Sequence, residues 1–328
     1  MTANPHPFSS LSPEVVIDAI ESTGRLSDLR VFALNSYENR VYQIGIDGGE
    51  PLIAKFYRPE RWSDAQILEE HRFSLQLAEA ELPVVAPLAD AAGATLFHYQ
   101  DFRFALFPRR GGHAPDLGDP DTQLMLGRLM GRLHAIGELE AYQARPALNV
   151  QRFGIESYQF IAEHCIPADL HRAYVSLCED LLRRVEQIFR EVKPRTLRSH
   201  GDCHVGNMLS RDEEHCFFVD LDDSRAAPAI QDLWMLLSGD RQERTAQLSE
   251  ILEGYREFRD FELREIGLIE ALRTLRLMHF SAWLARRWRD PAFPMAFPWF
   301  GSERYWADHI LELREQLAAL NEAPLTLY

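Results

Sequence analysis

The sequence predicts an α+β protein of two lobes, a small β-rich lobe over residues 1–108 and a larger, mainly helical lobe over residues 109–328. Apolar residues alternate with a period of two along much of the first third of the chain, which indicates strands. Beyond residue 120 they recur with the spacing of helical faces. The run Pro108-Arg109-Arg110-Gly111-Gly112 separates the two patterns, so we place the lobe boundary and a hinge there.

The first lobe is expected to contain five strands and one helix. Residues 41–46 and 51–57 predict a hairpin, because Asp47-Gly48-Gly49-Glu50 between them favours a turn. Ser63 is a suitable N-cap and predicts a helix that runs to about Ala80. The other expected strands cover residues 30–34 and the stretches on either side of Tyr99-Gln100-Asp101, the second with Phe102, Phe104 and Leu106 on one face.

The second lobe is expected to be a set of helices with one short β-rich insert around His200. The expected helices cover about residues 126–136, 170–192, 242–258, 263–287 and 305–321. The aromatic-rich stretch from Trp283 to Trp306 is interpreted as core packing, with the wall of a substrate pocket as the alternative.

Composition narrows the class of protein. A chain of 328 residues with 46% hydrophobic and 26% charged residues is an ordinary globular protein with room for two cores. The net charge of −15 argues against nucleic acid or an anionic membrane as the main partner. The four cysteines form no regular framework, and the N-terminus has no signal-peptide pattern. We therefore expect a cytoplasmic protein with reduced thiols.

The stretch from His200 to Asn207 carries the strongest functional signal. In protein kinases a loop Asp orients the acceptor hydroxyl, and an Asn five positions later ligates Mg²⁺. Asp202 and Asn207 have this spacing, and the apolar run Phe217-Phe218-Val219 leads to Asp220 as a kinase strand leads to the metal-binding Asp. We therefore expect Asp202 to accept the proton, Asn207 and Asp220 to hold Mg²⁺, ATP to donate the phosphate, and the fold to be protein-kinase-like.

Three residues of the first lobe are expected to contact the nucleotide. Lys55 lies in the middle of a predicted strand, where a lysine needs a partner; the α- and β-phosphates and a helix carboxylate would supply it. Glu70 is the favoured carboxylate and Glu69 the alternative, because adjacent helix residues face different ways. The loop Asn35–Arg40 lies where kinases carry a glycine-rich loop but has no glycine, so Ser36 is expected to contact ATP.

Two other interpretations of the His200 segment are weaker. Zinc binding by His200, Cys203 and His204 would need further ligands, and the chain has no C-x-x-C or H-E-x-x-H motif. A metallophosphatase would share the fragment Gly201-Asp202-Cys203-His204 but needs companion motifs that are missing. We interpret His134 as a packed, hydrogen-bonded histidine and Asp232 as a structural carboxylate that braces the catalytic loop.

The sequence resembles a known family. It is similar, over nearly its whole length, to the bacterial stress response kinase A family, within the wider group of aminoglycoside-phosphotransferase and choline-kinase-like enzymes. The strings that carry the resemblance are Leu34 to Tyr42, Lys55 to Trp62, His200 to Asn207, Val219 to Asp223, Gln231 to Leu237, and Asp290 to Pro294.

The resemblance implies an ATP- and Mg²⁺-dependent, non-specific serine/threonine protein kinase. It implies a cytoplasmic monomer that phosphorylates itself and acts in the stress response on protein substrates. It places proton acceptance on Asp202, metal on Asn207 and Asp220, an ATP contact on Ser36, and Asp220 among the active-site residues.

The sequence itself leaves the acceptor open. About a dozen residues separate Asp220 from Asp232, and no Ala-Pro-Glu follows, whereas eukaryotic protein kinases have a long activation segment. A kinase of a small alcohol or amino alcohol is therefore the second hypothesis, and Asp222, Asp223 and the negative charge permit a cationic acceptor. A nucleotide-binding regulator without turnover is the third, although retention of Lys55 and Asp202 argues against it.

Overall fold

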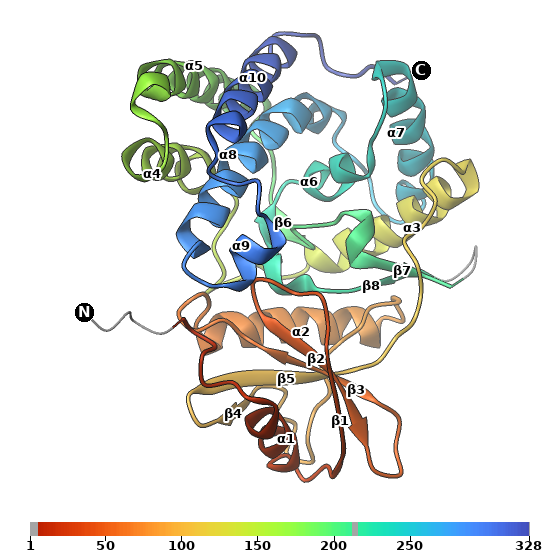
Figure 1. Cartoon of the computed structure of the whole chain (residues 1–328). Helices are drawn as coiled ribbons and strands as arrows, with labels where there is room; N and C mark the ends of the chain where they lie inside the picture. Colours follow the sequence, from red (N-terminus) through yellow and green to blue (C-terminus); the bar gives the residue numbers. More distant parts are fainter. Residues whose placement is uncertain (1–5, 212–215, 328) are drawn as a thin grey trace. The chain divides into compact units, whose positions relative to one another are not determined.

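A computed structural model describes residues 6–211 and 216–327 and divides into two compact units (Figure 1). The first unit comprises residues 1–116, 142–145 and 204–224. The second comprises residues 117–141, 146–203 and 225–328. Neither unit is continuous in sequence, and each is described here by itself.

The first unit is built on a five-stranded antiparallel sheet of order β1-β2-β3-β5-β4. The strands are β1 (Ser27–Ala33), β2 (Arg40–Ile46), β3 (Leu52–Phe56), β4 (Phe97–Tyr99) and β5 (Phe102–Pro108). All five predicted strands are confirmed, with ends shifted by a few residues. The predicted helix is also confirmed as α2 (Asp64–Glu79), and Ser63 caps it in a capping box with Gln66.

The two faces of the sheet bury different side chains, because successive residues of a strand point to opposite faces. Ala54 and Phe56 of β3 pack in a core with Phe104 and with helix α1 (Pro13–Glu21). Lys55 lies on the opposite face, where Tyr57 packs in a second cluster with Ile67 of α2. The alternation of β3 therefore turns the Lys55 side chain toward the α2 side of the sheet.

A small hairpin attaches the segment from His204 to Ser224 to the same unit. Its strands are β7 (Met208–Ser210) and β8 (Cys216–Phe218). The backbone of Phe218 donates to the Pro83 carbonyl and accepts from the Val85 N–H, each at 2.9 Å. These bonds fix the end of β8, and with it the residues that follow, relative to the five-stranded sheet.

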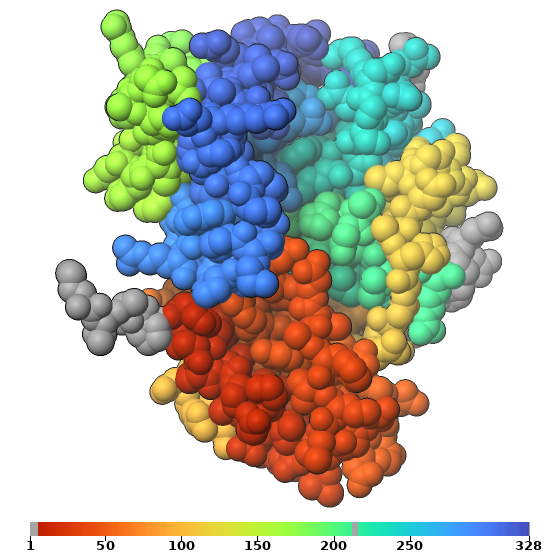
Figure 2. Space-filling model, viewed as in Figure 1, coloured from red at the N-terminus to blue at the C-terminus, as the bar shows by residue number. Residues whose placement is uncertain are grey.

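The second unit is mainly helical. Its helices are α3 (Pro120–Gly137), the π-helix Gln151–Ile155, α4 (Glu156–His164), α5 (Ala168–Val192), α6 (Ile230–Leu233), α7 (Arg241–Tyr255), α8 (Ile269–Arg287), α9 (Ala292–Ala296) and α10 (Glu303–Ala319), with short 3₁₀ turns between some of them. One short strand pair, β6 (Leu197–Ser199) with β9 (Arg225–Ala227), lies among them. In Figure 2 the green surface of α4 and α5 adjoins the blue surface of α8 and α10, and these helices pack on one another.

Glycines allow α3 and α7 to approach closely. A Cβ atom on Gly127 would lie 2.0 Å from the Ile251 carbonyl oxygen, and one on Gly131 would lie 2.5 Å from that of Tyr255. A larger residue at either position would push the two helices apart. The five predicted helices of this region are confirmed, whereas α4, α6 and α9, and α1 of the first unit, were not predicted. Within residues 6–211 and 216–327, no helix is both long and apolar enough to cross a membrane.

Candidate active site

The two expected metal-binding residues meet in the first unit, beside the β7–β8 hairpin. The Val219 N–H donates to the Asn207 carbonyl at 3.0 Å, which places Asn207 next to the residue before Asp220. Asp220 has a left-handed backbone (φ 59°), a conformation that is costly for a non-glycine residue and that concentrates at functional sites. Its side chain is 52% exposed. The backbone thus places Asn207 next to the segment that presents the Asp220 carboxylate, and metal binding by the two residues stays a prediction.

Lys55 is held by this carboxylate. Its Nζ lies 2.5 Å from Asp220 Oδ1 and 3.9 Å from Asp222 Oδ1, and the Lys55 side chain is only 9% exposed. Burial by itself lowers the pKa of Lys55, but the charges of Asp220, Asp222 and Glu70 outweigh it and raise the pKa above its usual value. Lys55 is therefore a fixed cation beside the Asp220 carboxylate.

The two adjacent glutamates of α2 have different surroundings. Glu69 accepts hydrogen bonds from the N–H groups of residues 143, 144 and 145 at 2.7, 2.9 and 2.8 Å, so both of its oxygens are bound to the backbone of that segment. Glu70 is buried and accepts from the Ser74 hydroxyl at 2.9 Å, while its Oε2 has no hydrogen-bond partner within residues 6–211 and 216–327. Burial raises the Glu70 pKa, and Lys55 opposes this shift.

A direct ion pair between Lys55 and Glu70 is not formed in the described residues, because Lys55 is bound to Asp220 instead. The charge of Glu70 nevertheless helps to raise the pKa of Lys55. Glu70, rather than Glu69, is thus the helix carboxylate that is available to Lys55.

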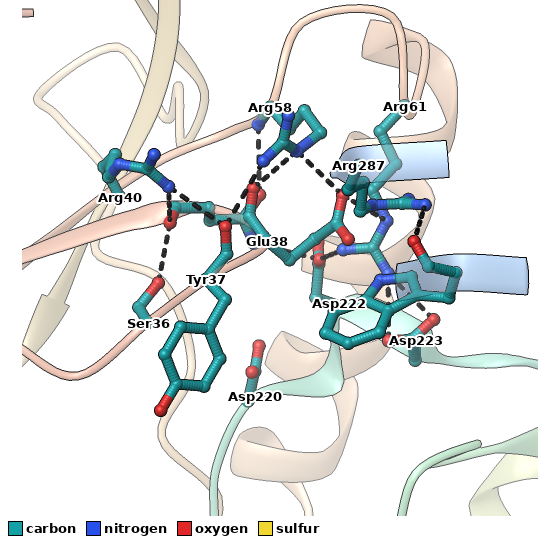
Figure 3. Close-up of polar contacts among 12 residues, drawn as sticks. Ser36, Tyr37, Glu38, Arg40, Arg58, Arg61, Asp220, Asp222, Asp223 and Arg287 are labelled. Atoms are coloured by element: carbon teal, nitrogen blue, oxygen red, sulfur yellow. Dashed lines mark hydrogen bonds and ion pairs between the residues drawn. The ribbon is translucent and has the colours of Figure 1, made fainter. Parts of the chain in front are cut away.

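A second group of charges ties the glycine-free loop to the Asp220 segment (Figure 3). Arg61 bridges Asp222 and Asp223, and its Nε lies 3.7 Å from Glu38 of the loop. Asn39 donates from Nδ2 to Asp222 Oδ2 at 3.0 Å. Burial raises the Asp222 pKa, but Arg61 and Lys55 outweigh it and lower the pKa, so this buried carboxylate is ionised. The network holds the loop by side chains where a glycine-rich loop would rely on its backbone.

Ser36 lies near the start of the same loop, and its hydroxyl bonds to the loop's own backbone. The Ser36 hydroxyl donates to the Asn39 carbonyl at 2.7 Å. This bond shapes the loop, and contact between Ser36 and ATP stays a prediction.

Asp202 lies in the second unit, on the turn after β6. Its Oδ1 accepts from Arg276 Nη1 of α8 at 2.5 Å, and its side chain is 23% exposed. The turn uses Gly201 in a left-handed conformation (φ 85°), which glycine adopts without strain. Asp202 thus presents a partly exposed carboxylate whose one oxygen is held by an arginine.

A buried carboxylate braces this turn, as the sequence predicts. Asp232 is fully buried and accepts from the His200 N–H at 2.7 Å and from the Gly201 N–H at 2.8 Å. His134 is equally buried, with Nε2 3.0 Å from Asp232 and Nδ1 3.0 Å from the Tyr255 hydroxyl. The interpretations of Asp232 as a brace and of His134 as a packed, hydrogen-bonded residue are confirmed.

Sequence patterns missed two charged residues of these sites, Arg61 and Arg276. Arg61 lies in the string Lys55 to Trp62, which carries the family resemblance, and this could have marked it as a candidate site residue. Arg276 lies on a helix 74 residues beyond Asp202, and no local pattern marks it. Cys203, part of the alternative zinc hypothesis, is buried with its Sγ 3.8 Å from Met130 Sδ, which indicates packing.

The donor set fits a magnesium ion better than a softer metal. Asp220 and Asn207 provide a carboxylate and an amide oxygen, which Mg²⁺ prefers, and Mg²⁺ keeps several waters when it binds few protein ligands. Lys55 adds a cation beside them for phosphate. No group of three or more His, Cys, Asp or Glu residues with metal-site geometry occurs in the part of the chain that the structure describes.

Comparison with known proteins gives related sequences over the whole chain. A model of the phosphotransferase enzyme family matches residues 29–269. Stress response kinase A of Escherichia coli K12 is 45% identical over 321 residues, covering 98% of this chain and 97% of its own. A serine/threonine protein kinase, RdoA, of Salmonella typhimurium is 44% identical over 328 residues, covering 100% and 99%.

Solved structures share the fold at lower identity. An amicoumacin kinase in complex with AMP-PNP and Ca²⁺ aligns with a TM-score of 0.69 at 19% identity, covering 91% of this chain and 90% of its own. A microcompartment-associated aminopropanol kinase gives 0.67 at 18%, covering 93% and 96%. Choline kinase LicA of Streptococcus pneumoniae gives 0.62 at 14%, covering 93% and 98%. The predicted two-lobed, protein-kinase-like α+β fold is confirmed.

Proposed function

Because this chain belongs to the phosphotransferase enzyme family, and within it to the stress response kinase A family, we propose that it is an ATP- and Mg²⁺-dependent serine/threonine protein kinase. The enzyme class, a phosphotransferase that acts on hydroxyl groups, follows from the family. The proposal adds the protein acceptor, autophosphorylation, a part in the stress response, and a cytoplasmic monomer. The observation that carries it is the meeting of Lys55, Asn207 and Asp220 in one unit.

Each residue has a role in this mechanism. Asp220 and Asn207 would hold Mg²⁺, and Lys55 would bind the phosphates of ATP. When bound, Mg²⁺ neutralises charge on the phosphates. Asp202 orients the acceptor hydroxyl and accepts its proton, while Asp232 keeps the Asp202 turn in place through two backbone bonds.

Two further residues have proposed roles at the nucleotide. Glu70 is proposed as a second partner for Lys55, since Glu70 Oε2 has no hydrogen-bond partner in the described residues and could accept from Lys55 if Asp220 were engaged with a metal. Ser36 is proposed to contact ATP from the loop that Arg61 and Asn39 brace. We also propose lobes over residues 1–108 and 109–328, with a hinge near Phe107–Gly111 that closes on ATP.

A kinase of a small alcohol is the second candidate. The segment between Asp220 and Asp232 is short, and it holds only β9 and two short helical turns. The names of the solved neighbours include aminopropanol kinase and choline kinase, and these are similar in fold alone. A nucleotide-binding regulator without turnover is a third candidate, favoured by no observation in the structure.

Transfer of labelled γ-phosphate from Mg-ATP tests the proposal. Purified protein is incubated alone and with a generic protein acceptor, beside the variant Asp202→Ala. We expect label on Ser or Thr and a loss of about 10²-fold or more in the variant, the scale of a positioned proton acceptor. Nucleotide binding without protein labelling would move the assignment to a small acceptor, and near-normal turnover of Asp202→Ala would remove Asp202 from its role.

A further inference from the structure

The side chain that holds the proposed proton acceptor is itself exposed. Arg276 is 42% exposed although its Nη1 binds Asp202 Oδ1 at 2.5 Å. A guanidinium has five N–H donors, and in the described part of the chain Nη1 is the only Arg276 nitrogen with a hydrogen-bond or ion-pair partner. An acceptor whose hydroxyl reaches Asp202 therefore meets a positive charge with donors to spare.

The chain around Arg276 is also positive, in contrast to the protein as a whole. Residues 271–302 contain five arginines and one acidic residue, whereas the net charge of the protein is −15. The one acidic residue, Asp290, is buried and accepts from the Ala292 N–H. This segment, which comprises most of α8 and all of α9, offers no accessible carboxylate to a cation.

The neighbouring arginine of α8, Arg273, is engaged by other side chains. Arg273 lies 3.5 Å from Glu270, and its guanidinium lies over the Trp234 ring at 5.5 Å. Its charge is thus shared with a carboxylate and an aromatic face. Asp202 has two oxygens, so it can keep Arg276 on Oδ1 and still accept a hydroxyl.

We propose that Arg276 is a specificity-determining residue that selects acceptors with an acidic group beside the phosphorylated hydroxyl, as in a Ser or Thr flanked by Asp or Glu. The same charge disfavours amino alcohols and other cationic acceptors. The proposal rests on the role of Asp202 in the function proposed above. Charges within a few ångströms at a protein surface change affinity by about tenfold or more.

Two matched peptides test this selection. They share one Ser and differ only in the four flanking residues, which are Glu in one and Lys in the other. For the wild-type protein we expect kcat/KM for the Glu peptide to exceed that for the Lys peptide by about tenfold or more. Arg276→Glu should lower this ratio by at least the same factor, mainly through KM, and Arg276→Lys should restore the preference for Glu.

Arg286→Glu is the matched control. It makes the same charge change on α8, about 15 Å farther along the helix, where Arg286 donates to the Glu156 carbonyl. The peptide ratio should be unchanged in this variant. Mg-ATP binding, measured by calorimetry, should be close to wild type in all variants and shows that they fold.

Three results would overturn the inference: a wild-type ratio near one, an equal loss on both peptides in Arg276→Glu, or an equal change of the ratio in the control. Labelling of neither peptide would contradict the proposed protein acceptor instead. The charge preference is then decided with glycerate and 1-amino-2-propanol as acceptors, and a preference for the amino alcohol would overturn the role of Arg276.

Discussion

Replacing Asp232 with Asn should both destabilise the protein and slow phosphoryl transfer. The carboxylate is fully buried and accepts two backbone N–H groups, from His200 and Gly201, at 2.7 and 2.8 Å. An Asn has nearly the same shape but turns one of these acceptors into an NH₂ donor. One backbone N–H would then face a donor in a fully buried site.

The magnitude follows from these contacts. A hydrogen bond to a charged group contributes about 1.5–3 kcal/mol, and an unsatisfied buried N–H costs about 1–3 kcal/mol. We therefore expect Asp232→Asn to lower the free energy of unfolding by about 3–5 kcal/mol. Asp202 directly follows the two braced residues, and a displacement near 1 Å can cost about 10²-fold in rate. Turnover should fall by about that factor in variant protein that is still folded.

Urea unfolding followed by tryptophan fluorescence measures the first effect, and ATP turnover at low temperature measures the second. Asp240→Asn is the control, because Asp240 is an exposed N-cap of α7 and Asn caps helices equally well. If Asp232→Asn has a free energy of unfolding within about 0.5 kcal/mol of wild type and unchanged turnover, the claim that Asp232 braces the turn is refuted, since that range is typical of inert surface substitutions.

Three further predictions concern other carboxylates. Asp220→Ala should abolish Mg²⁺-dependent ATP binding, because it removes the proposed metal carboxylate; unchanged Mg-ATP affinity by calorimetry would exclude Asp220 from the metal site. Glu69→Ala should lower the free energy of unfolding by about 3–5 kcal/mol in urea, because three N–H groups of residues 143–145 lose their acceptor, whereas a loss under about 1 kcal/mol would contradict that role. Burial raises the pKa of Glu265 from 4.5 to about 7, so the native state holds this proton more tightly and its contribution to stability is lost as the pH rises through about 7. The free energies of unfolding in urea at pH 5 and pH 8 should therefore differ by up to about 3 kcal/mol less in Glu265→Gln than in wild type, and an unchanged pH dependence would contradict this.

Local patterns predicted much of the fold, because its strands and long helices have regular apolar faces. The hairpin of β2 and β3 and the Ser63 cap of α2 were predicted from turn and capping residues. Helix α1 was missed although Ser12 and Pro13 form a typical start, because its nine residues make fewer than three helical turns, too few for the apolar pattern to repeat. The short α4 and α9 depend on packing against longer helices, and local sequence does not determine such contacts.

In the candidate sites, too, local sequence marked some residues, whereas others are placed by contacts between distant segments. The spacing of Asp202, Asn207 and Asp220 marks these residues in the sequence, and the brace by Asp232 was also predicted. The sequence could not distinguish Glu69 from Glu70, because the segment 143–145 that occupies Glu69 is 74 or more residues away. The partner of Asp202 was missed for the same reason, since Arg276 is placed by the packing of α8.

The central claim, phosphoryl transfer to Ser or Thr of a protein, is tested most directly by competition in one tube. Purified protein and labelled Mg-ATP are given a Ser-containing protein acceptor together with choline and 1-amino-2-propanol, and the label is followed into each fraction. The account predicts label on Ser or Thr in the protein fraction, and none there when Asp202→Ala replaces the wild-type protein. Label in the amino alcohols, with the protein fraction unlabelled, would contradict it.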